Sequence, residues 1–371
     1  MSHSNICATK SRTGSLGALR FCITLIVIAL LASWNLPAKG LAAAGELDPT
    51  FGNSGKVTTD FGASASAAAV AVQSDGKLVA AGLAGGVGTG DNFALARYNT
   101  DGSLDRDFDF DGMATIDFFG DQDVARAVAI SPDGKILAAG FASGGMNFDF
   151  ALVRLNPNGS LDSAFGVGGR VTTDFFGSSD RAFAMALQPD GKIVLAGNTM
   201  MGGATEADFA LARYNNDGSL DLSFGSGGRV TTDFFGEKDE AYAVAIKPDG
   251  RILAAGKAEM QGGGRMEDFA LARYNSDGSL DRSFGSNGKV TTDFFGAEDE
   301  ARGITGMADG RLLLAGYSRP GSSSSNANFA LARYDADGAL DSSFGSNGRV
   351  TADFFGREDG ACGAAIRNDG K

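Results

Sequence analysis

The amino-acid sequence predicts an all-β fold, a β-propeller built from four-stranded antiparallel blades. Three observations predict it: a long repeat of nearly constant length, four strand-like segments in each copy, and glycine-rich turns between them. A period of this size indicates one supersecondary unit stacked many times, in which neighbouring copies complete each other's core. We therefore expect residues 45–371 to form a single repeat domain. The landmark phenylalanine of the repeat recurs every 57 to 60 residues, at Phe51, Phe108, Phe165, Phe224, Phe284 and Phe344.

Residues 1–44 differ from the rest of the chain in composition. Three basic residues are followed by a run of 14 apolar residues from Phe21 to Trp34, and then by small residues that end at Ala44. This order is typical of a secretory signal peptide. The run is short beside the roughly 20 residues that span a bilayer, which disfavours the alternative of an uncleaved anchor. We predict cleavage after Ala44, a secreted, periplasmic or cell-envelope location, and no membrane insertion of the mature chain.

Removal of this segment leaves a mature chain that is poor in reactive side chains. The only His (His3), the only Trp (Trp34) and two of the three Cys (Cys7 and Cys22) leave with it, so Cys362 is the single remaining thiol. Internal disulfides, catalytic pairs that need histidine and His-ligated zinc are thereby excluded. The whole chain has a net charge of −13, and the mature chain is more acidic, which argues against nucleic acid as a partner.

Each copy contains four segments with strand character. In one copy they lie at 241–246 (AYAVAI), 251–256 (RILAAG), 209–214 (FALARY) and 229–235 (RVTTDFF). The first two are joined by Pro-Asp-Gly, in which Pro fixes the first corner and Gly takes the left-handed position of a hairpin bulge. The third alternates with period two, and the fourth is β-branched. Because no segment shows helical periodicity, four antiparallel strands form the expected blade.

The repeat motifs carry two resemblances. The sequence AVAIKPDGRILAAG at 243–256 resembles the inner strand, hairpin and second strand of a WD40 unit, although the Trp-Asp pair and the Gly-His of that unit are missing. The motifs LDxxFG, VTTDF, PDGK, LAAG and FALARYNxDG, found in nearly every copy over 47–371, more closely resemble the delta-60 repeat family of bacterial exported proteins. This resemblance implies an exported repeat protein and supplies no catalytic residue.

The strand count predicts five complete blades, a partial sixth blade and an incomplete ring. Segments of the VTTDF and AVAI types occur six times, whereas those of the LAAG and FALARY types occur five times. We expect residues 57–61 to be the outer strand of the sixth blade and residues 361–366 to be its inner strand. Since natural domains rarely leave a strand edge so open, we expect the chain to be a truncated product or fragment.

The order of strands sorts the loops onto two faces. The PDGK turns and the NxDGSLDxSFG connections share one face and are nearly identical in all copies. The opposite face, called here the variable face, carries the outer-to-inner connections and the loops between second and third strands. Loops that differ on a rigid scaffold commonly bind partners, so we expect this face to bind a protein or a glycan. The loops of the second kind vary in length and lie at 83–91, 141–147, 198–207, 257–267 and 317–327.

One aspartate per copy leads into the inner strand on the variable face. Such a set of carboxylates is a candidate ring around the channel mouth that holds a cation. The alternative is a solvated acidic rim that keeps the protein soluble. The five residues are Asp123, Asp180, Asp239, Asp299 and Asp359.

A second candidate site is confined to one copy, in which DFDFDG replaces SFGSGG. Asp107, Asp109 and Asp111, followed by Gly112, reproduce the first half of a calcium-binding loop. The twelfth position of such a loop holds Phe118 in place of the usual Glu. Calcium is therefore the one cofactor that the sequence suggests, with a plain acidic connection as the alternative.

A repeated charge pair is expected between the third and fourth strands. We interpret it as a cross-strand ion pair in every blade and not as a catalytic pair. The arginines are Arg97, Arg154, Arg213, Arg273 and Arg333, and the aspartates are Asp117, Asp174, Asp233, Asp293 and Asp353.

These features favour an exported, non-enzymatic β-propeller scaffold that binds a protein or glycan through the variable face. One alternative is a calcium-assisted propeller enzyme, a lyase or glycoside hydrolase, because two carboxylates can supply acid and base without histidine. Against catalysis, the channel-mouth carboxylates are copied around the ring, whereas an active site normally breaks internal symmetry. A structural envelope component is the third hypothesis.

Overall fold

A computed structural model describes residues 4–5, 46–86, 90–200, 206–261, 266–321 and 326–366. These residues form strands and turns and contain no helix, which confirms the predicted all-β class. The predicted signal peptide lies outside the described residues except for β1 (Ser4–Asn5), which pairs with β2. In the described part of the chain, no helix has the length and hydrophobicity to cross a membrane.

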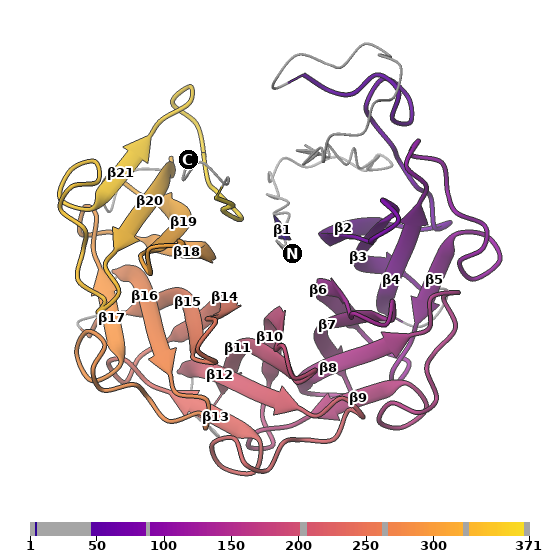
Figure 1. Cartoon of the computed structure of the whole chain (residues 1–371), viewed down its shortest axis with the longest axis horizontal. Coiled ribbons are helices and arrows are strands. Elements are labelled where there is room, and N and C mark those ends of the chain that lie inside the picture. Colours follow the sequence, from indigo (N-terminus) through magenta and orange to yellow (C-terminus); the bar gives the residue numbers. More distant parts are fainter. Residues whose placement is uncertain are drawn as a thin grey trace.

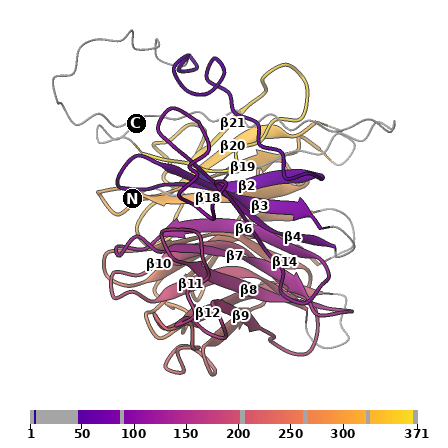
Figure 2. The same cartoon turned by 90° about the vertical axis from the view of Figure 1, so that its right-hand side faces the viewer.

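Five four-stranded antiparallel sheets follow one another along the chain, and β1 adds a short edge strand to the first. Figure 1 shows the sheets placed around a common centre, with the inner strand of each nearest to it. Figure 2 shows neighbouring sheets stacked face to face. The inner strands are β2 (Ala65–Val72), β6 (Asp123–Ile130), β10 (Asp180–Leu187), β14 (Asp239–Ile246) and β18 (Asp299–Gly306). The second strands are β3 (Leu78–Gly85), β7 (Ile136–Ser143), β11 (Ile193–Met200), β15 (Ile252–Glu259) and β19 (Leu312–Ser318). The third strands are β4 (Asp91–Tyr98), β8 (Phe148–Leu155), β12 (Ala207–Tyr214), β16 (Glu267–Tyr274) and β20 (Asn328–Tyr334). The outer strands are β5 (Met113–Ile116), β9 (Arg170–Thr173), β13 (Arg229–Thr232), β17 (Lys289–Thr292) and β21 (Arg349–Ala352).

A β-bulge interrupts every inner strand and explains the glycine of the LAAG motif. In β14 the pairing with β15 shifts between Ala241 and Ala243. A Cβ atom on Gly256 would lie 1.8 Å from the carbonyl oxygen of Glu240, so no larger residue fits opposite the bulge. The same approach, at 1.9 Å, occurs at Gly82, Gly140, Gly197 and Gly316. The bulge leaves one inner-strand residue of each blade outside the ladder.

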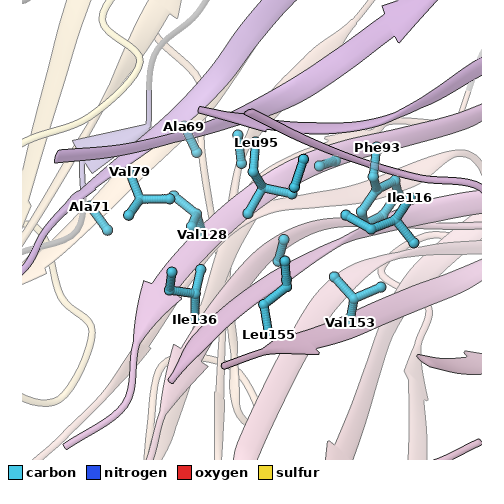
Figure 3. Packing of buried hydrophobic residues seen from close by; sticks show 14 of the residues in the cluster. Ala69, Ala71, Val79, Phe93, Leu95, Ile116, Val128, Ile136, Val153 and Leu155 are labelled. Atoms are coloured by element: carbon cyan, nitrogen blue, oxygen red, sulfur yellow. The ribbon is translucent and has the colours of Figure 1, made fainter. Parts of the chain in front are cut away.

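The hydrophobic core lies between blades and not within them. One cluster joins Val79 and Leu95 of the first sheet to Val128 and Ile136 of the second, as Figure 3 shows. Three further clusters fill the remaining junctions between neighbouring sheets. Many of the residues in contact are alanines, which let the sheets approach closely. Each repeat therefore depends on its neighbour for burial, as the repeat length predicts.

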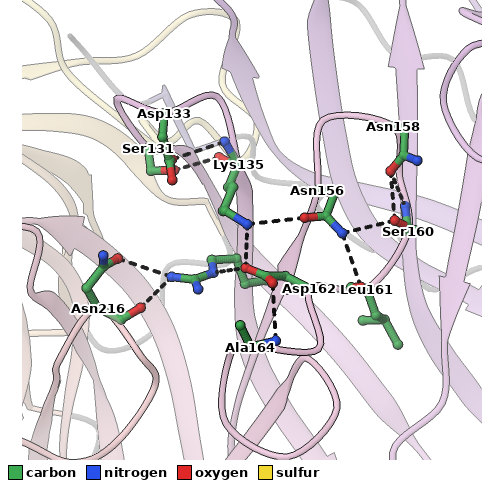
Figure 4. Close-up of polar contacts among 11 residues, drawn as sticks. Ser131, Asp133, Lys135, Asn156, Asn158, Ser160, Leu161, Asp162, Ala164 and Asn216 are labelled. Carbon is green, nitrogen blue, oxygen red and sulfur yellow. Dashed lines mark hydrogen bonds and ion pairs between the residues drawn. The ribbon is translucent and has the colours of Figure 1, made fainter.

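In the first four blades, a buried arginine fixes the blade to the next one. These contacts lie on the face of the PDGK turns and the LDxxF connections, called here the constant face. Arg154 donates from Nε to Oδ2 of Asp162 at 2.7 Å, and Lys135 donates to the same oxygen at 2.6 Å. The guanidinium also lies over the ring of Phe165, with 4.5 Å to the centroid, and donates to the carbonyl oxygen of Asn216 in the following repeat. Figure 4 shows Lys135, Asp162 and Asn216 in this network. Equivalent pairs join Arg97 to Asp105, Arg213 to Asp221, Arg273 to Asp281, and Arg333 to Asp341.

The expected ion pair between third and fourth strands is therefore wrong. Each arginine finds its partner eight residues later in the LDxxF connection, because that connection folds back over the end of the third strand. The aspartate after the outer strand has another role: Oδ1 of Asp174 accepts a hydrogen bond from the amide of Gly177 at 2.6 Å. That aspartate shapes the turn that leads to the next blade.

The five blades form an open arc, and Figure 1 shows a gap between the first sheet and the last. This arrangement confirms five complete blades in an incomplete ring. Residues 57–61 and 361–366 form no strand, so the expected strands of a sixth blade are wrong. Val57 packs on the first sheet instead, and the amide of Ala361 donates to the carbonyl of Gly316 beside the last sheet. Neither segment has a second strand of its own with which to pair.

Candidate functional site

The two kinds of loop that the strand order places on the variable face lie together there. The amide of Ser143, at the end of β7, donates to the carbonyl of Gln122 in the preceding acidic connection at 2.9 Å. Glu259 bonds to Lys238 in the same way at 3.0 Å. The loops between second and third strands therefore lie against the outer-to-inner connections, as the strand order predicts.

The bulge position of the inner strand is where the copies differ most near the centre. The residues there are half-buried or exposed, and they range from alanine to arginine. Because the inner strands of neighbouring blades are adjacent, residues at this position meet those of the next blade. The five bulge residues are Ala68, Arg126, Phe183, Tyr242 and Arg302.

A cross-strand pair beside each bulge differs as strongly between copies. In the fourth sheet Glu240 lies opposite Lys257, and in the fifth Glu300 lies opposite Tyr317. The second residue of each pair directly follows the LAAG-type glycine. The other three pairs are Ser66 with Leu83, Val124 with Phe141, and Arg181 with Asn198.

Aromatic and arginine side chains at these positions contact one another from blade to blade. The rings of Phe183 and Tyr242 have centroids 5.1 Å apart. Arg302 lies 5.6 Å from the ring centroids of both Tyr242 and Tyr317. Arg181 lies 4.6 Å from the ring centroid of Phe148. We call this set the central arc; it comprises Arg126, Phe141, Phe148, Arg181, Phe183, Tyr242, Arg302 and Tyr317.

One end of the central arc rests on a buried charge network. The Nζ of Lys257 lies 2.9 Å from Glu267, 3.3 Å from Glu240 and 3.8 Å from Glu300 of the next blade. Tyr242 donates to Oε2 of Glu240 at 2.5 Å. Although burial opposes it, the Lys257 ammonium holds the pKa of Glu240 below its usual value. Burial raises the pKa of Tyr242 well above its usual range, so this phenol stays protonated.

This network and the central arc were missed by the sequence-based prediction. The prediction looked for variation in loops, whereas these residues lie within strands whose flanking motifs are constant. A usable signal exists in the sequence. The residue one place after the inner-strand aspartate position varies among Ser, Val, Arg and Glu, and the residue three places after it varies among Ala, Arg, Phe and Tyr. The residue after the LAAG-type glycine differs in every copy.

Four of the five aspartates predicted to ring the channel mouth lie at blade junctions, where each contacts the preceding blade, and Asp359 follows the last blade. Asp123, Asp180, Asp239 and Asp299 are fully buried, and Asp359 is half-buried, so the first four are not a solvated rim. Oδ2 of Asp239 accepts a hydrogen bond from the amide of Phe234 at 2.7 Å, and the other members make the same contact. The first four therefore tie the end of one blade to the start of the next.

At three of these junctions the structure brings two more aspartates to the buried one. In each group, one oxygen from every carboxylate lies within 4.8 Å of the others. The three groups, called here the carboxylate trios, are Asp149, Asp174 and Asp180; Asp208, Asp233 and Asp239; and Asp268, Asp293 and Asp299. In each trio, the first aspartate lies 25 residues before the second and 31 before the third, and the sequence-based prediction treated these positions separately.

The DFDFDG segment does not bring its aspartates together in this way. Among the described residues, only the trios bring three or more metal-binding side chains together. Asp109 has a φ of +45° and occupies the place of the glycine that follows the landmark phenylalanine in other copies. Its amide donates to the carbonyl of Asn158 in the next repeat at 2.8 Å. Asp111 accepts a hydrogen bond from the amide of Met113, so these side chains shape a turn.

Repeated four-stranded sheets around a common centre, with cores between them, define a β-propeller repeat protein. Five segments, residues 73–108, 131–165, 188–224, 247–284 and 308–344, match the family model described as "Domain of unknown function (DUF5122) beta-propeller". The chain thus carries five repeats of this β-propeller family. No match was found among curated proteins.

Solved structures with similar folds share little sequence with this chain. A protein of unknown function from Dyadobacter fermentans is 13% identical over 76% of this chain and 81% of its own, with a TM-score of 0.44. A polysaccharide (ulvan) lyase is 12% identical over 73% and 67%, with a TM-score of 0.44. A gluconolactonase from Xanthomonas campestris is 15% identical over 67% and 68%, with a TM-score of 0.36. Similarity at this level carries no argument about activity.

Proposed function

We propose that this protein is an exported, non-enzymatic β-propeller scaffold that binds an acidic glycan at the central arc. The observation that carries the proposal is the placement of Arg181. Its guanidinium lies 4.6 Å from the ring centroid of Phe148 and 5.7 Å from that of Phe141, on the variable face. Within the described residues Arg181 forms no ion pair.

The chemistry of this group suits a sugar that carries a carboxylate. Aromatic faces offer flat apolar surface for sugar rings, and a guanidinium binds a carboxylate with two parallel hydrogen bonds. The rings of Phe141 and Phe148 hold the guanidinium in place, so little side-chain freedom is lost on binding. At the opposite end of the arc, Arg302 is already paired with Glu300. The acidic ligand group is therefore expected near Arg181.

Calorimetric titration with oligomers of hexuronic acids tests this assignment. Oligomers of the same length whose carboxyl groups have been reduced are the control ligand. We expect Arg181→Gln to weaken binding of the acidic oligomer about tenfold, which corresponds to ~1.4 kcal/mol. Arg106→Gln, an exposed position on the constant face, is expected to leave the affinity unchanged. Equal binding of acidic and reduced oligomers would contradict the proposal. Capture of an envelope protein that depends on Arg181, without glycan binding, would favour a protein partner instead.

Export rests on the sequence of residues 1–44 and is proposed on that ground alone. Mass spectrometry of protein recovered from the envelope and the medium is expected to find a chain that begins at Gly45. Recovery of the intact chain in the cytoplasm alone would contradict export.

A carboxylate-based enzyme, a lyase or glycoside hydrolase assisted by calcium, is the second candidate. The observation that favours it is the network of Tyr242, Glu240 and Glu300, which breaks the internal symmetry as an active site would. Burial raises the pKa of Glu300, which would suit a general acid. Against it, Glu300 is almost fully buried and Tyr242 titrates too high to act as a base. Incubation with hexuronic oligomers and calcium, followed by ultraviolet absorbance for unsaturated products and by reducing-end assay, separates catalysis from binding.

A further inference from the structure

We propose that the three carboxylate trios are calcium-binding sites that link neighbouring blades. This inference is independent of the glycan proposal, because the trios lie at blade junctions and not in the central arc.

Three separate elements position the carboxylates of each trio. In the second of them, Asp208 is the second residue of β12, and Asp233 follows the end of β13. Asp239 is the first residue of β14 and belongs to the next sheet. Adjacent strands of one blade thus supply two carboxylates, and the neighbouring blade supplies the third.

Several buried carboxylate oxygens in the trios lack the partners that buried charges need. Asp239 is fully buried, and its Oδ1 atom makes no hydrogen bond. The corresponding oxygens of Asp180 and Asp299 are buried as well and make no well-aligned hydrogen bond, with only the hydroxyls of Thr199 and Ser318 beside these carboxylates. Asp208 and Asp268 are also buried, and in the described part of the chain they accept no hydrogen bond and form no ion pair. A buried carboxylate of this kind is stable only when it is protonated or binds a cation.

Basic side chains lie nearby but do not neutralise the trios. Lys289 donates from Nζ to the backbone carbonyl of Asp233 at 2.8 Å, and Arg229 donates to the carbonyl of Asp174 at 2.6 Å. Among the described residues, no Lys or Arg nitrogen lies within 4.0 Å of a trio carboxylate. The negative charge of each trio is therefore left for another cation.

The donor atoms point to calcium. All are oxygens, and hard cations prefer carboxylate oxygen, whereas zinc favours the nitrogen and sulfur donors that are absent from these groups. Calcium binds oxygens at about 2.3–2.6 Å, so oxygens up to ~4.8 Å apart can share one ion. At the third trio, the hydroxyl of Ser318 lies opposite Asp299 in the strand ladder and is buried without a well-aligned hydrogen bond. It is a fourth oxygen available to that ion.

Three carboxylates with oxygens within 4.8 Å of one another repel each other when they are ionised. A divalent cation bound between them would remove this repulsion between like charges.

One junction and the free edge of the fifth sheet serve as internal controls. At the first junction, Asn92 stands where the trios have their third-strand aspartate, and at the free edge of the fifth sheet Asn328 does so. Each of these places keeps carboxylates at two of the three trio positions, so its attraction for a divalent cation is weaker. Calcium binding is therefore expected at the other three junctions between blades.

The test is calcium titration of the full chain after chelator treatment, by calorimetry and by elemental analysis of the dialysed protein. We expect three calcium ions per chain and a higher Tm in millimolar calcium, because ligands that bind the native state stabilise it. Asp233→Asn is expected to lower the stoichiometry from three to two. This residue is exposed and the amide can still accept the hydrogen bond from Gly236, so the fold should be retained, which circular dichroism checks.

Two matched variants sharpen the test. Asp117→Asn changes the equivalent residue at the junction that contains Asn92, and Asp111→Asn changes the DFDFDG segment. Neither is expected to alter the stoichiometry of three. The proposal is overturned if millimolar calcium gives no heat and no rise in Tm. It also fails if a folded Asp233→Asn protein still binds three ions, or if the ion is lost in Asp117→Asn or Asp111→Asn instead.

Discussion

Phe183 and Tyr242 occupy the same bulge position on the inner strands of adjacent blades, and their ring centroids lie 5.1 Å apart. The contact exists because the bulge turns one residue of each inner strand out of the ladder, where it meets the equivalent residue of the next blade. The symmetry of the repeat is thereby broken at the centre of the molecule, while the motifs on either side remain constant.

Phe183→Ala is expected to weaken binding of a hexuronic oligomer by about tenfold, because stacking surface is removed next to Arg181. Calorimetric titration measures the change. Leu222→Ala, at a highly exposed position on the constant face, is the matched control and should bind as the parent does. Unchanged affinity in Phe183→Ala would place the ligand outside the central arc.

Arg154→Ala is expected to lower the free energy of unfolding by about 3–5 kcal/mol, since the change leaves Asp162 buried without its nearest guanidinium. The contact to Asn216 in the following repeat is lost as well. Chemical denaturation followed by circular dichroism measures the loss, and the exposed Arg106→Ala variant should be near neutral. A loss below about 1 kcal/mol would mean that the pair behaves like a surface salt bridge.

The same pairs predict sensitivity to acid. The hydrogen bond from Lys135, with that from Arg154, holds the pKa of Asp162 below its usual 3.8 against the effect of burial. The folded pKa is lower than the unfolded one, so the stabilisation is present above about pH 4 and is lost as the pH falls through the folded value. Tm should therefore drop between about pH 4 and pH 2, and the drop should be smaller in Asp162→Asn. A drop of the same size in that variant, or a smaller drop in the exposed control Asp190→Asn, would count against this pair as its source.

Gly256→Ala is expected to destabilise the fourth blade by at least about 2 kcal/mol, because the new methyl group would overlap the carbonyl oxygen of Glu240. Gly306→Ala is the control, since its added Cβ meets nothing within 4 Å and its φ is not positive. That variant should melt at or above the parent temperature. Equal Tm values for the two variants would show that the bulge can relax around a side chain.

Lys257→Met is expected to cost about 3–5 kcal/mol, because three glutamates would remain around the site of a buried ammonium. The neighbouring carboxylates raise the pKa of Lys257 against the effect of burial, so the parent carries this charge throughout the neutral range. Urea denaturation at neutral pH measures the loss. Lys247→Met, in a hairpin turn without an ion pair among the described residues, is the control. If Lys257→Met has the same free energy of unfolding as the parent, the glutamates are protonated or hydrated.

Much of the architecture could be predicted from sequence because the signals are local and repeated. The hairpin of each blade follows from Asp-Gly, which Pro precedes in three of the five blades, and the strand order follows from the succession of motifs. The partner of Arg154 could not be predicted in this way. Two aspartates lie within reach of its strand, and only the fold of the LDxxF connection decides in favour of Asp162 over Asp174. The prediction of two solitary strands of a sixth blade is wrong for a related reason, since a strand forms only where a partner strand completes the ladder.

By itself, the sequence determined the all-β class, the repeat, the four-stranded blade and the two faces. The tertiary structure alone decided which repeated residues act together. It placed Asp208 and Asp233 beside Asp239 across a blade junction, and it set Phe183 against Tyr242 at the centre. The physical reason is that local patterns fix the direction of a strand, whereas the approach of side chains 25 to 60 residues apart depends on how blades stack.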